Sequence, residues 1–210
     1  LAPFAEPQIE QYLVDRSHNT FHVETLDAGD FAESRPRGVI GVVNGEITTV
    51  DAGYADHIDP EQDILKIAVV ERHKNTHHIG IGYIQGYGLK SGAVATSISH
   101  DSHNIIVIGD NDEDMELAVR ELMRTQGGYT IVENHKVFDT LALPVMGLMS
   151  DNGFEKDNET LGRMIHKAHE MGVKDGHDPF ITLSFMALPV IPQIRITPRG
   201  VFDVKAWKIL

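Results

Sequence analysis

Residues 99–109 read SHDSHNIIVIG, six polar side chains in a row followed by four apolar ones and a glycine. An apolar run at residues 92–98 precedes them. We interpret it and residues 105–108 as two strands, or as a strand and a helix packed on a sheet. Polar groups at the mouth of a buried sheet cost stability unless they have partners. The stretch therefore predicts a buried sheet with a functional polar loop at its edge.

The chain on the N-terminal side of this stretch predicts a helix, a hairpin and a buried strand. The hairpin is the clearest of them, because Asn44-Gly45 tolerates the positive φ angles of a tight turn. An apolar run broken only by Lys66 is typical of a central strand. The elements predicted here are a helix at residues 6–16 with Ile9, Tyr12, Leu13 and Arg16 on one face, a loop at 27–36, the hairpin at 39–50 and the central strand at 64–70.

On the C-terminal side the strongest signal is a helix at residues 111–126. Asn111 can cap it, acidic residues fill its first turn, and Gly127 and Gly128 end it. The other elements predicted here are a hairpin of residues 129–132 and 137–143, helices at 157–171 and at 180–188 after Asp178-Pro179, and strands at 194–197 and 201–204.

Strands and helices interleave along the whole chain. This order predicts an α/β (or α+β) fold, with a mixed β-sheet and flanking helices in a single layered domain. We place that domain at residues 38–210, after an N-terminal helix and loop at residues 1–37.

The composition excludes several classes of function. The formal net charge of −13, from 31 acidic and 18 basic residues, argues against a nucleic-acid partner, which would need clustered Lys and Arg. No run approaches the roughly 18 apolar residues of a membrane span, so we expect no membrane partner. The absence of cysteine excludes disulfides, Cys-ligated metals and thiol catalysis, and it fits a cytoplasmic location.

The chain begins LAPFAEP, without an initiator methionine or a signal-peptide pattern. We interpret it as a processed or excised piece whose N-terminal neighbour is missing. A tag remnant or simple methionine removal is the alternative.

Five glycines lie within residues 79–92, a density that favours tight packing or close approach of the backbone to a partner. The order strand, G-x-G-x-x-G, helix is missing, so the segment is not a dinucleotide-binding fingerprint. We therefore expect these glycines to serve packing. We also expect most of the methionines to fill the core, namely Met115, Met123, Met146, Met149, Met164 and Met186.

The polar stretch belongs to a longer one, GLKSGAVATSISHDSHNIIVIG at residues 88–109. It is followed by NDEDMELAV at 111–119, LPVMGLMS at 143–150, DPFITLSFMALPVIP at 178–192 and TPRGVFDV at 197–204. Together these stretches resemble the C-terminal domain of bacterial and archaeal adenine deaminases, in the amidohydrolase superfamily. The resemblance covers residues 39–210, and the first 35 or so residues match less clearly.

The resemblance implies metal-dependent hydrolysis of adenine to hypoxanthine and ammonia. In that family a binuclear manganese or iron centre sits in an amidohydrolase barrel that precedes this domain, held partly by a His-x-His pair. This chain contains no His-x-His and is too short for a barrel plus this domain. We therefore expect no cofactor in this chain, which should be inactive alone. The implied partners are the N-terminal barrel and adenine, and we expect a homo-oligomer.

The polar loop supplies the main candidate site. His100, Asp101, His103 and Asn104 are candidates for proton transfer or substrate contact, because imidazoles can carry the proton that the leaving ammonia needs. Metal binding is a weaker interpretation, and we assign no metal ligand. The alternative is a structural turn whose Asp and Ser side chains bond to their own backbone.

A second set of candidates would contact the substrate. Ser99 and Ser102 belong to it as neighbours of the histidines, and Glu71, Arg72 and His73 because they follow the predicted central strand. The alternative for the last three is an ion pair on a solvated rim. The remaining histidines considered, His77, His78, His166 and His169, are expected to face solvent.

These interpretations depend on the loop being reachable from solvent and facing a partner polypeptide. Two rivals stay open. One is a non-catalytic module that stabilises the barrel or forms an oligomer interface. The other is a small self-contained hydrolase that uses the His and Asp cluster directly, which would have to bind metal and release ammonia by itself.

Overall fold

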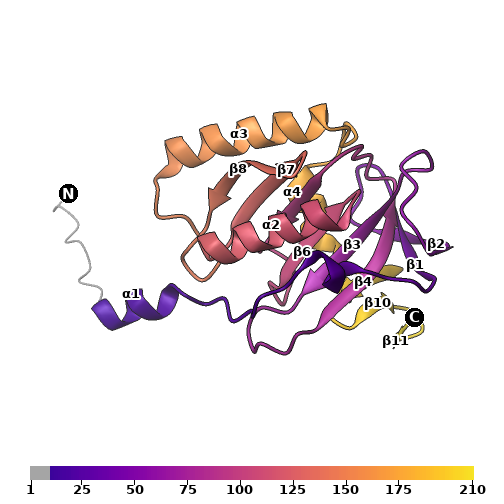
Figure 1. Ribbon diagram of the computed structural model, residues 1–210, viewed down its shortest axis with the longest axis horizontal. Coiled ribbons are helices and arrows are strands. Elements are labelled where there is room, and N and C mark those ends of the chain that lie inside the picture. Colours follow the sequence, from indigo (N-terminus) through magenta and orange to yellow (C-terminus); the bar gives the residue numbers. More distant parts are fainter. Residues whose placement is uncertain (1–9) are drawn as a thin grey trace, which may run out of the picture.

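An eight-stranded sheet forms the centre of the structure, a computed structural model that describes residues 10–210 (Figure 1). The strand order is β2-β1-β4-β3-β6-β5-β7-β8. Only β1 and β4 pair in parallel, while the other neighbours pair antiparallel, so the predicted mixed sheet is confirmed. The strands are β1 (Arg37–Val42), β2 (Thr49–Ala55), β3 (Ile64–Val70), β4 (Ile79–Gln85), β5 (Ala93–Thr96), β6 (Ile105–Gly109), β7 (Gly128–Glu133) and β8 (Lys136–Ala142).

The central strand β3 is buried on both faces, as its continuous apolar sequence predicts. Successive side chains point to opposite faces of a sheet. Leu65, Ile67 and Val69 therefore enter one core cluster, whereas Ala68 and Val70 enter the other. The strand needs a cover on each side, and helices supply it.

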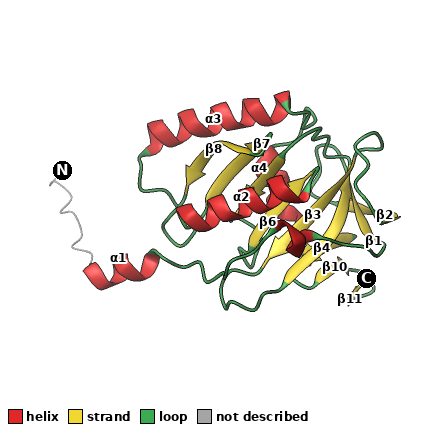
Figure 2. Cartoon of the chain, in the orientation of Figure 1, coloured by secondary structure: helices red, strands yellow, loops and turns green. Residues whose placement is uncertain are grey.

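One face is covered by helix α2 (Asp112–Thr125) and the short 3-10 helix η1 (Ala28–Phe31) (Figure 2). The other face packs against α3 (Phe154–Glu170) and α4 (Pro179–Met186). The predicted layered domain with flanking helices is confirmed.

A second, three-stranded antiparallel sheet adds to the α3–α4 side. It consists of β9 (Ile194–Thr197), β10 (Gly200–Asp203) and β11 (Lys208–Ile209), and its buried side chains join the same core as β3 and β4. The sequence predicted the first two strands but neither β11 nor a separate sheet. Two residues are too short for any periodicity to reveal a strand.

Two helices, α2 and α4, begin at the capping residues that the sequence predicts. The side chain of Asn111 accepts the N–H of Asp114 at 2.7 Å, and that of Asp178 accepts the N–H of Ile181 at 2.8 Å. Helix α3 begins at Phe154, whereas the predicted start was residue 157. The residue before it, Gly153, has no side chain that could cap the helix, so the sequence carries no start signal there.

The N-terminal segment differs more from its prediction. Helix α1 spans Gln11–Ser17, stands away from the sheet and buries none of its residues (Figure 1). The first part of the predicted helix, with Ile9, lies outside the described residues. Phe31 is fully buried against the sheet, so part of residues 1–37 packs on the domain. The boundary at residue 37 stays a prediction.

Two further details depart from the sequence. The predicted hairpin exists as β1 and β2, but residues 43–48 form its loop and Asn44-Gly45 is only part of it. Strand β4 lies in the glycine-rich segment, where the glycines hid its apolar pattern. No helix within residues 10–210 has the length and apolar character to cross a bilayer.

The glycines of this segment serve packing, as predicted. A Cβ added at Gly80 would lie 1.9 Å from the carbonyl oxygen of Thr197 and 2.5 Å from the nitrogen of Gly200. One added at Gly92 would lie 2.1 Å from the carbonyl oxygen of Val132. The turn between β9 and β10 therefore sits directly on β4, and the two sheets meet through backbone.

Replacing Gly80 by Ala should destabilise the domain by roughly 1–3 kcal/mol or more, because the methyl group meets backbone that cannot move without separating the sheets. Gly162→Ala is the matched control, since nothing lies within 4 Å of its added Cβ on α3. That change should be neutral or stabilise by up to about 1 kcal/mol. Urea denaturation measures both, and equal stabilities of the two variants would contradict this packing.

Candidate functional site

The predicted polar loop joins β5 to β6, and we call residues 99–104 the His/Asp loop. Because β6 pairs with β3 through Ile105 and Val70, the loop lies next to the residues that follow β3. His73 Nε2 lies 2.6 Å from the carbonyl oxygen of Ser102, which it can approach only as a donor. The structure thus brings the two predicted groups of site residues together at one sheet edge.

Arg72 is the residue that ties this edge together. Its side chain is buried, and its guanidinium lies 4.4 Å above the ring of Phe21. Nε donates to the carbonyl oxygen of His103, and Nη2 donates to that of Met146 at 3.0 Å. Within residues 10–210 Arg72 forms no ion pair, and desolvation lowers its pKa to about 10. Such a group is suited to holding chain segments rather than a substrate.

Asn104 anchors the loop through its side chain, and the side chain of Ser99 is buried beneath the loop. Asn104 is buried, accepts the main-chain N–H of Arg72 at 3.1 Å and donates to the hydroxyl of Ser102 at 3.1 Å. The hydroxyl oxygen of Ser99 is buried and has no hydrogen-bond partner among the described residues. The side chains of these two predicted site residues therefore point into the domain, away from solvent.

His103 sits half-buried with its backbone in the left-handed region, at φ 51°. Its Nδ1 accepts the main-chain N–H of Ser99 at 3.2 Å, and its own N–H donates to the Ser99 carbonyl at 2.6 Å. Since Nδ1 is an acceptor, the neutral ring carries its proton on Nε2. Burial lowers the pKa of His103, and the neighbouring His100 and Arg72 lower it further.

His100 and Asp101 complete the outer part of the loop. The ring of His100 is half-buried, with its centroid 5.7 Å from that of His103 and 4.9 Å from that of Phe185 on α4. Asp101 and Ser102 are exposed and line a hollow of about 440 Å³. His103 and Ser102 border another hollow, of about 400 Å³. Asp101 and His103 are therefore accessible from outside the domain, whereas His100 is half-buried against Phe185 and lines neither hollow.

Glu71 organises the turn that follows β3. Its carboxylate accepts the N–H of His73 at 2.6 Å and both the N–H and the hydroxyl of Thr76, at 3.1 and 2.9 Å. Burial raises the pKa of this carboxyl, but these hydrogen bonds and that from the N–H of Lys74 together lower it below the usual value. Its oxygens are thus occupied by its own turn.

The other predicted histidines lie where the sequence places them, or close to it. His77 and His166 are exposed and lie beside Glu24 and Glu170. His78 is exposed as well, but His169 is only partly so, because its Nδ1 lies 2.9 Å from the carbonyl oxygen of Val173. No three His, Asp or Glu side chains within residues 10–210 are grouped closely enough to hold a metal ion.

Sequence reasoning missed the contribution of distant segments. Phe21, Thr20 and Met146 border Arg72 but lie far from it in the chain. The expectation that Met146 and Met149 fill the core was wrong, since they are 50% and 54% exposed beside the loop. Methionine commonly fills a core, yet residues 144–149 form turns at the sheet edge, where these two side chains are exposed.

The molecule is an α/β domain in which a mixed sheet carries a histidine- and acid-bearing loop at one edge. The adenine deaminase C-terminal domain family matches residues 43–208, and the chain belongs to that family.

Curated relatives agree with this assignment. An adenine deaminase of Desulfitobacterium hafniense (strain Y51) is 44% identical over 204 residues, which are 93% of this chain and 36% of the relative. One of Nitratidesulfovibrio vulgaris (strain DP4) is 45% identical over 90% of this chain and 35% of its own length. One of Bacillus subtilis (strain 168) is 47% identical over 81% and 30%, respectively. The chain spans about a third of the length of the relatives it matches.

NMR titration of His103 should give a pKa below the ordinary 6.5. The folded state then binds this proton more weakly than the unfolded chain, so the site's contribution to the free energy of unfolding is complete above about pH 6.5 and declines as the pH falls below it. Arg72→Met should raise the measured pKa, since it removes a nearby positive charge. A midpoint at or above 6.5 in the unmodified chain would contradict the lowering of this pKa by burial and by the neighbouring Arg72 and His100.

Arg72→Met should also lower the free energy of unfolding, by roughly 1–3 kcal/mol, because buried carbonyl oxygens lose their donors. Arg120→Met is the control. That side chain is exposed on α2 and pairs with Glu116 one turn away, so its loss should cost about 0.5 kcal/mol or less. Urea denaturation compares them, and a negligible effect at Arg72 would show that the sheet edge does not depend on it.

Proposed function

We propose that this chain acts as the C-terminal domain of an enzyme that hydrolyses adenine to hypoxanthine and ammonia, and that its His/Asp loop adjoins the purine site. Family membership supports the first part, together with the adenine deaminase names of the relatives. The accessible side chains of Asp101 and His103 support the second. These two side chains carry the proposal, because within residues 10–210 neither the carboxylate of Asp101 nor the Nε2 of His103 has a hydrogen-bond partner.

In this proposal the role of each loop residue follows from its burial and its hydrogen bonds. Ser99, Asn104 and Arg72 fix the loop from inside, while the Nε2–H of His103 is available as a donor at neutral pH. In the proposed reaction water adds to the amidine carbon of adenine, and the amino nitrogen leaves as ammonia after gaining a proton. The Nε2–H of His103 can donate a hydrogen bond to a ring nitrogen of adenine. The exposed carboxylate of Asp101 can accept a proton or pass one on.

The remaining chemistry belongs outside this chain. Residues 10–210 offer no group of ligands that fits the binuclear metal centre implied by the family. In our proposal that centre is held by the catalytic domain, and this chain alone has no deaminase activity. A cytoplasmic location and assembly into homo-oligomers stay predictions.

A non-catalytic role remains the second candidate, and one observation favours it. The loop is tied to its own domain by several hydrogen bonds, including those of Arg72, Asn104 and His73. A loop held this firmly could simply stabilise the domain against its neighbour. Activity measurements on loop variants separate the two functions.

In the full-length enzyme, His103→Ala and Asp101→Ala should each lower kcat/KM by about 10²- to 10⁴-fold, the usual contribution of a positioned proton donor or acceptor. His103→Gln keeps an N–H donor and should retain more activity than His103→Ala. His166→Ala, an exposed histidine on α3, is the control and should leave ammonia release unchanged.

Thermal unfolding of the same variants tells the two candidate functions apart. Unchanged ammonia release with a lower Tm or altered assembly would overturn the catalytic proposal in favour of the non-catalytic module. Release of ammonia from adenine by residues 1–210 alone would overturn the division of labour and favour a self-contained hydrolase.

A further inference from the structure

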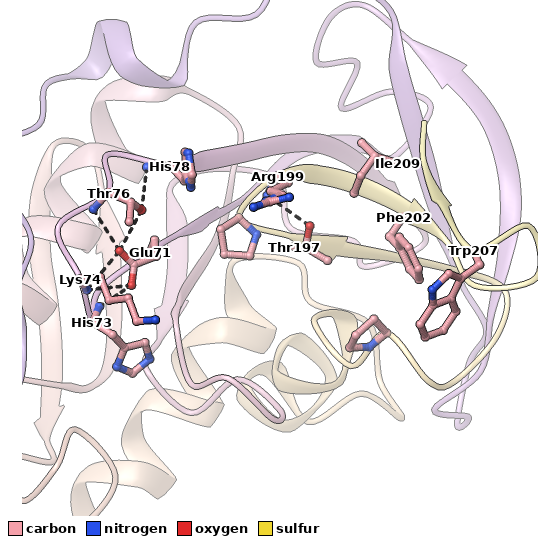
Figure 3. A pocket seen from close by; sticks show the side chains of 12 residues that line it. Glu71, His73, Lys74, Thr76, His78, Thr197, Arg199, Phe202, Trp207 and Ile209 are labelled. Atoms are coloured by element: carbon pink, nitrogen blue, oxygen red, sulfur yellow. Dashed lines mark hydrogen bonds between the residues drawn. The ribbon is translucent and has the colours of Figure 1, made fainter.

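Two hollows adjoin each other beside the His/Asp loop. The larger, of about 700 Å³, lies between the turn after β3 and the three-stranded sheet (Figure 3). It shares Pro189, Thr197 and Pro198 with the hollow of about 440 Å³ that reaches Asp101. We call the combined surface the Trp207 groove, and the residues that matter most in it are Lys74, Pro189, Val190, Arg199, Phe202 and Trp207.

The apolar side chains of the groove project outward. Trp207 is 70% exposed, with its ring edge-on to that of Phe202 at 5.2 Å between centroids, and Val190 is 64% exposed. In Figure 3, Phe202 and Trp207 stand together at the end of the groove away from Glu71. Soluble domains seldom leave contiguous large apolar side chains in water, and such patches mark interaction surfaces. The groove is therefore a surface that another body covers.

The charged side chains elsewhere in the groove indicate what kind of surface covers it. Lys74 and Arg199 line the groove and form no ion pair within residues 10–210, although the chain as a whole carries a net charge of −13. The carboxylate of Glu71 also lines it, but its oxygens are bonded to its own turn. A covering surface with acidic side chains near Lys74 and Arg199 would complement them. A second copy of this acidic chain would have to overcome the repulsion between two like net charges.

A small ligand is a poorer fit than a protein surface. Small-molecule sites are concave and bury most of the ligand among recessed side chains. Here Trp207 and Val190 stand out from the surface instead. Prominent aromatic side chains with cations beside them are typical of anchors in protein interfaces.

The length of the relatives points to the part of the same polypeptide that could cover the groove. About two-thirds of each relative lies outside the region that this chain matches, and the matched family is a C-terminal domain. That remainder must pack somewhere on this domain if the His/Asp loop adjoins its purine site. The groove begins at Asp101 and Ser102, which places it on the same side of the domain as the loop.

We infer that the Trp207 groove is the surface on which the catalytic domain of the full-length enzyme packs, through an apolar ridge flanked by acidic side chains. The inference rests on the proposed function for the identity of the partner. It adds the location of the interface and its main anchors.

Hydroxyl-radical footprinting of the full-length enzyme tests this directly. Trp207 should be oxidised at least fivefold more slowly than its 70% exposure in this structure and its intrinsic reactivity predict. Tyr54 and Phe154 are the controls, with exposures of 64% and 77% on β2 and at the start of α3. Neither lies in the groove, so both should react as their exposures predict.

Three outcomes would overturn the inference. Trp207 could react as fast as predicted, the two controls could be protected equally, or the protection could disappear when the enzyme is diluted to monomers. The last result would assign the groove to a second copy. None of these readouts depends on catalysis, so loss of activity in the loop variants tests the proposed function separately.

A pair of variants gives a second measurement. In the full-length enzyme Trp207→Asp should raise the rate of proteolytic cleavage between the two domains at least threefold, because a buried carboxylate weakens their packing. Phe154→Asp introduces the same charge outside the groove and should leave that rate unchanged. Equal rates for the two variants would also overturn the inference.

Discussion

Buried guanidinium groups bonded to main-chain carbonyls organise this domain. Burying a cation without a carboxylate costs free energy, which is why the pKa values of Arg72 and Arg195 fall to about 10. Each repays that cost with several donors in a fixed fork. Arg195 donates to the carbonyl oxygens of Ile47 at 2.6 Å and Ile191 at 2.7 Å. Arg72 does the same beneath the His/Asp loop. Irregular segments at both sites are thereby held without regular secondary structure.

The parts of the fold that sequence could predict are those decided by local chemistry. The apolar run of β3 and the Asn111 and Asp178 caps each follow from neighbouring residues. The missed parts depend on contacts between distant residues. Strand β11 exists only because β10 pairs with it, and Met146 and Met149 are exposed because their segment forms turns at the edge of the sheet.

The candidate site shows the same division. Residue types pointed to the His/Asp loop, and the two groups of candidates do meet at one sheet edge. Sequence could not separate residues that border the hollows with accessible side chains, such as His103 and Asp101, from those that hold the loop with buried ones, such as Arg72 and Asn104. Burial made that separation, since the side chains of Arg72 and Asn104 are buried and bonded to other parts of the chain. The resemblance named the family correctly, and the relatives extend well beyond this chain.

The partners of Arg72 lie at residues 20, 103 and 146, so the sheet edge closes only when widely separated parts of the chain have met. Contacts of such large sequence separation are slow to form, because the intervening chain must first lose its entropy. The hairpins and helices can form locally while the polypeptide is still being synthesised. The geometry of His103 therefore cannot be complete before the segment that contains Met146 has left the ribosome.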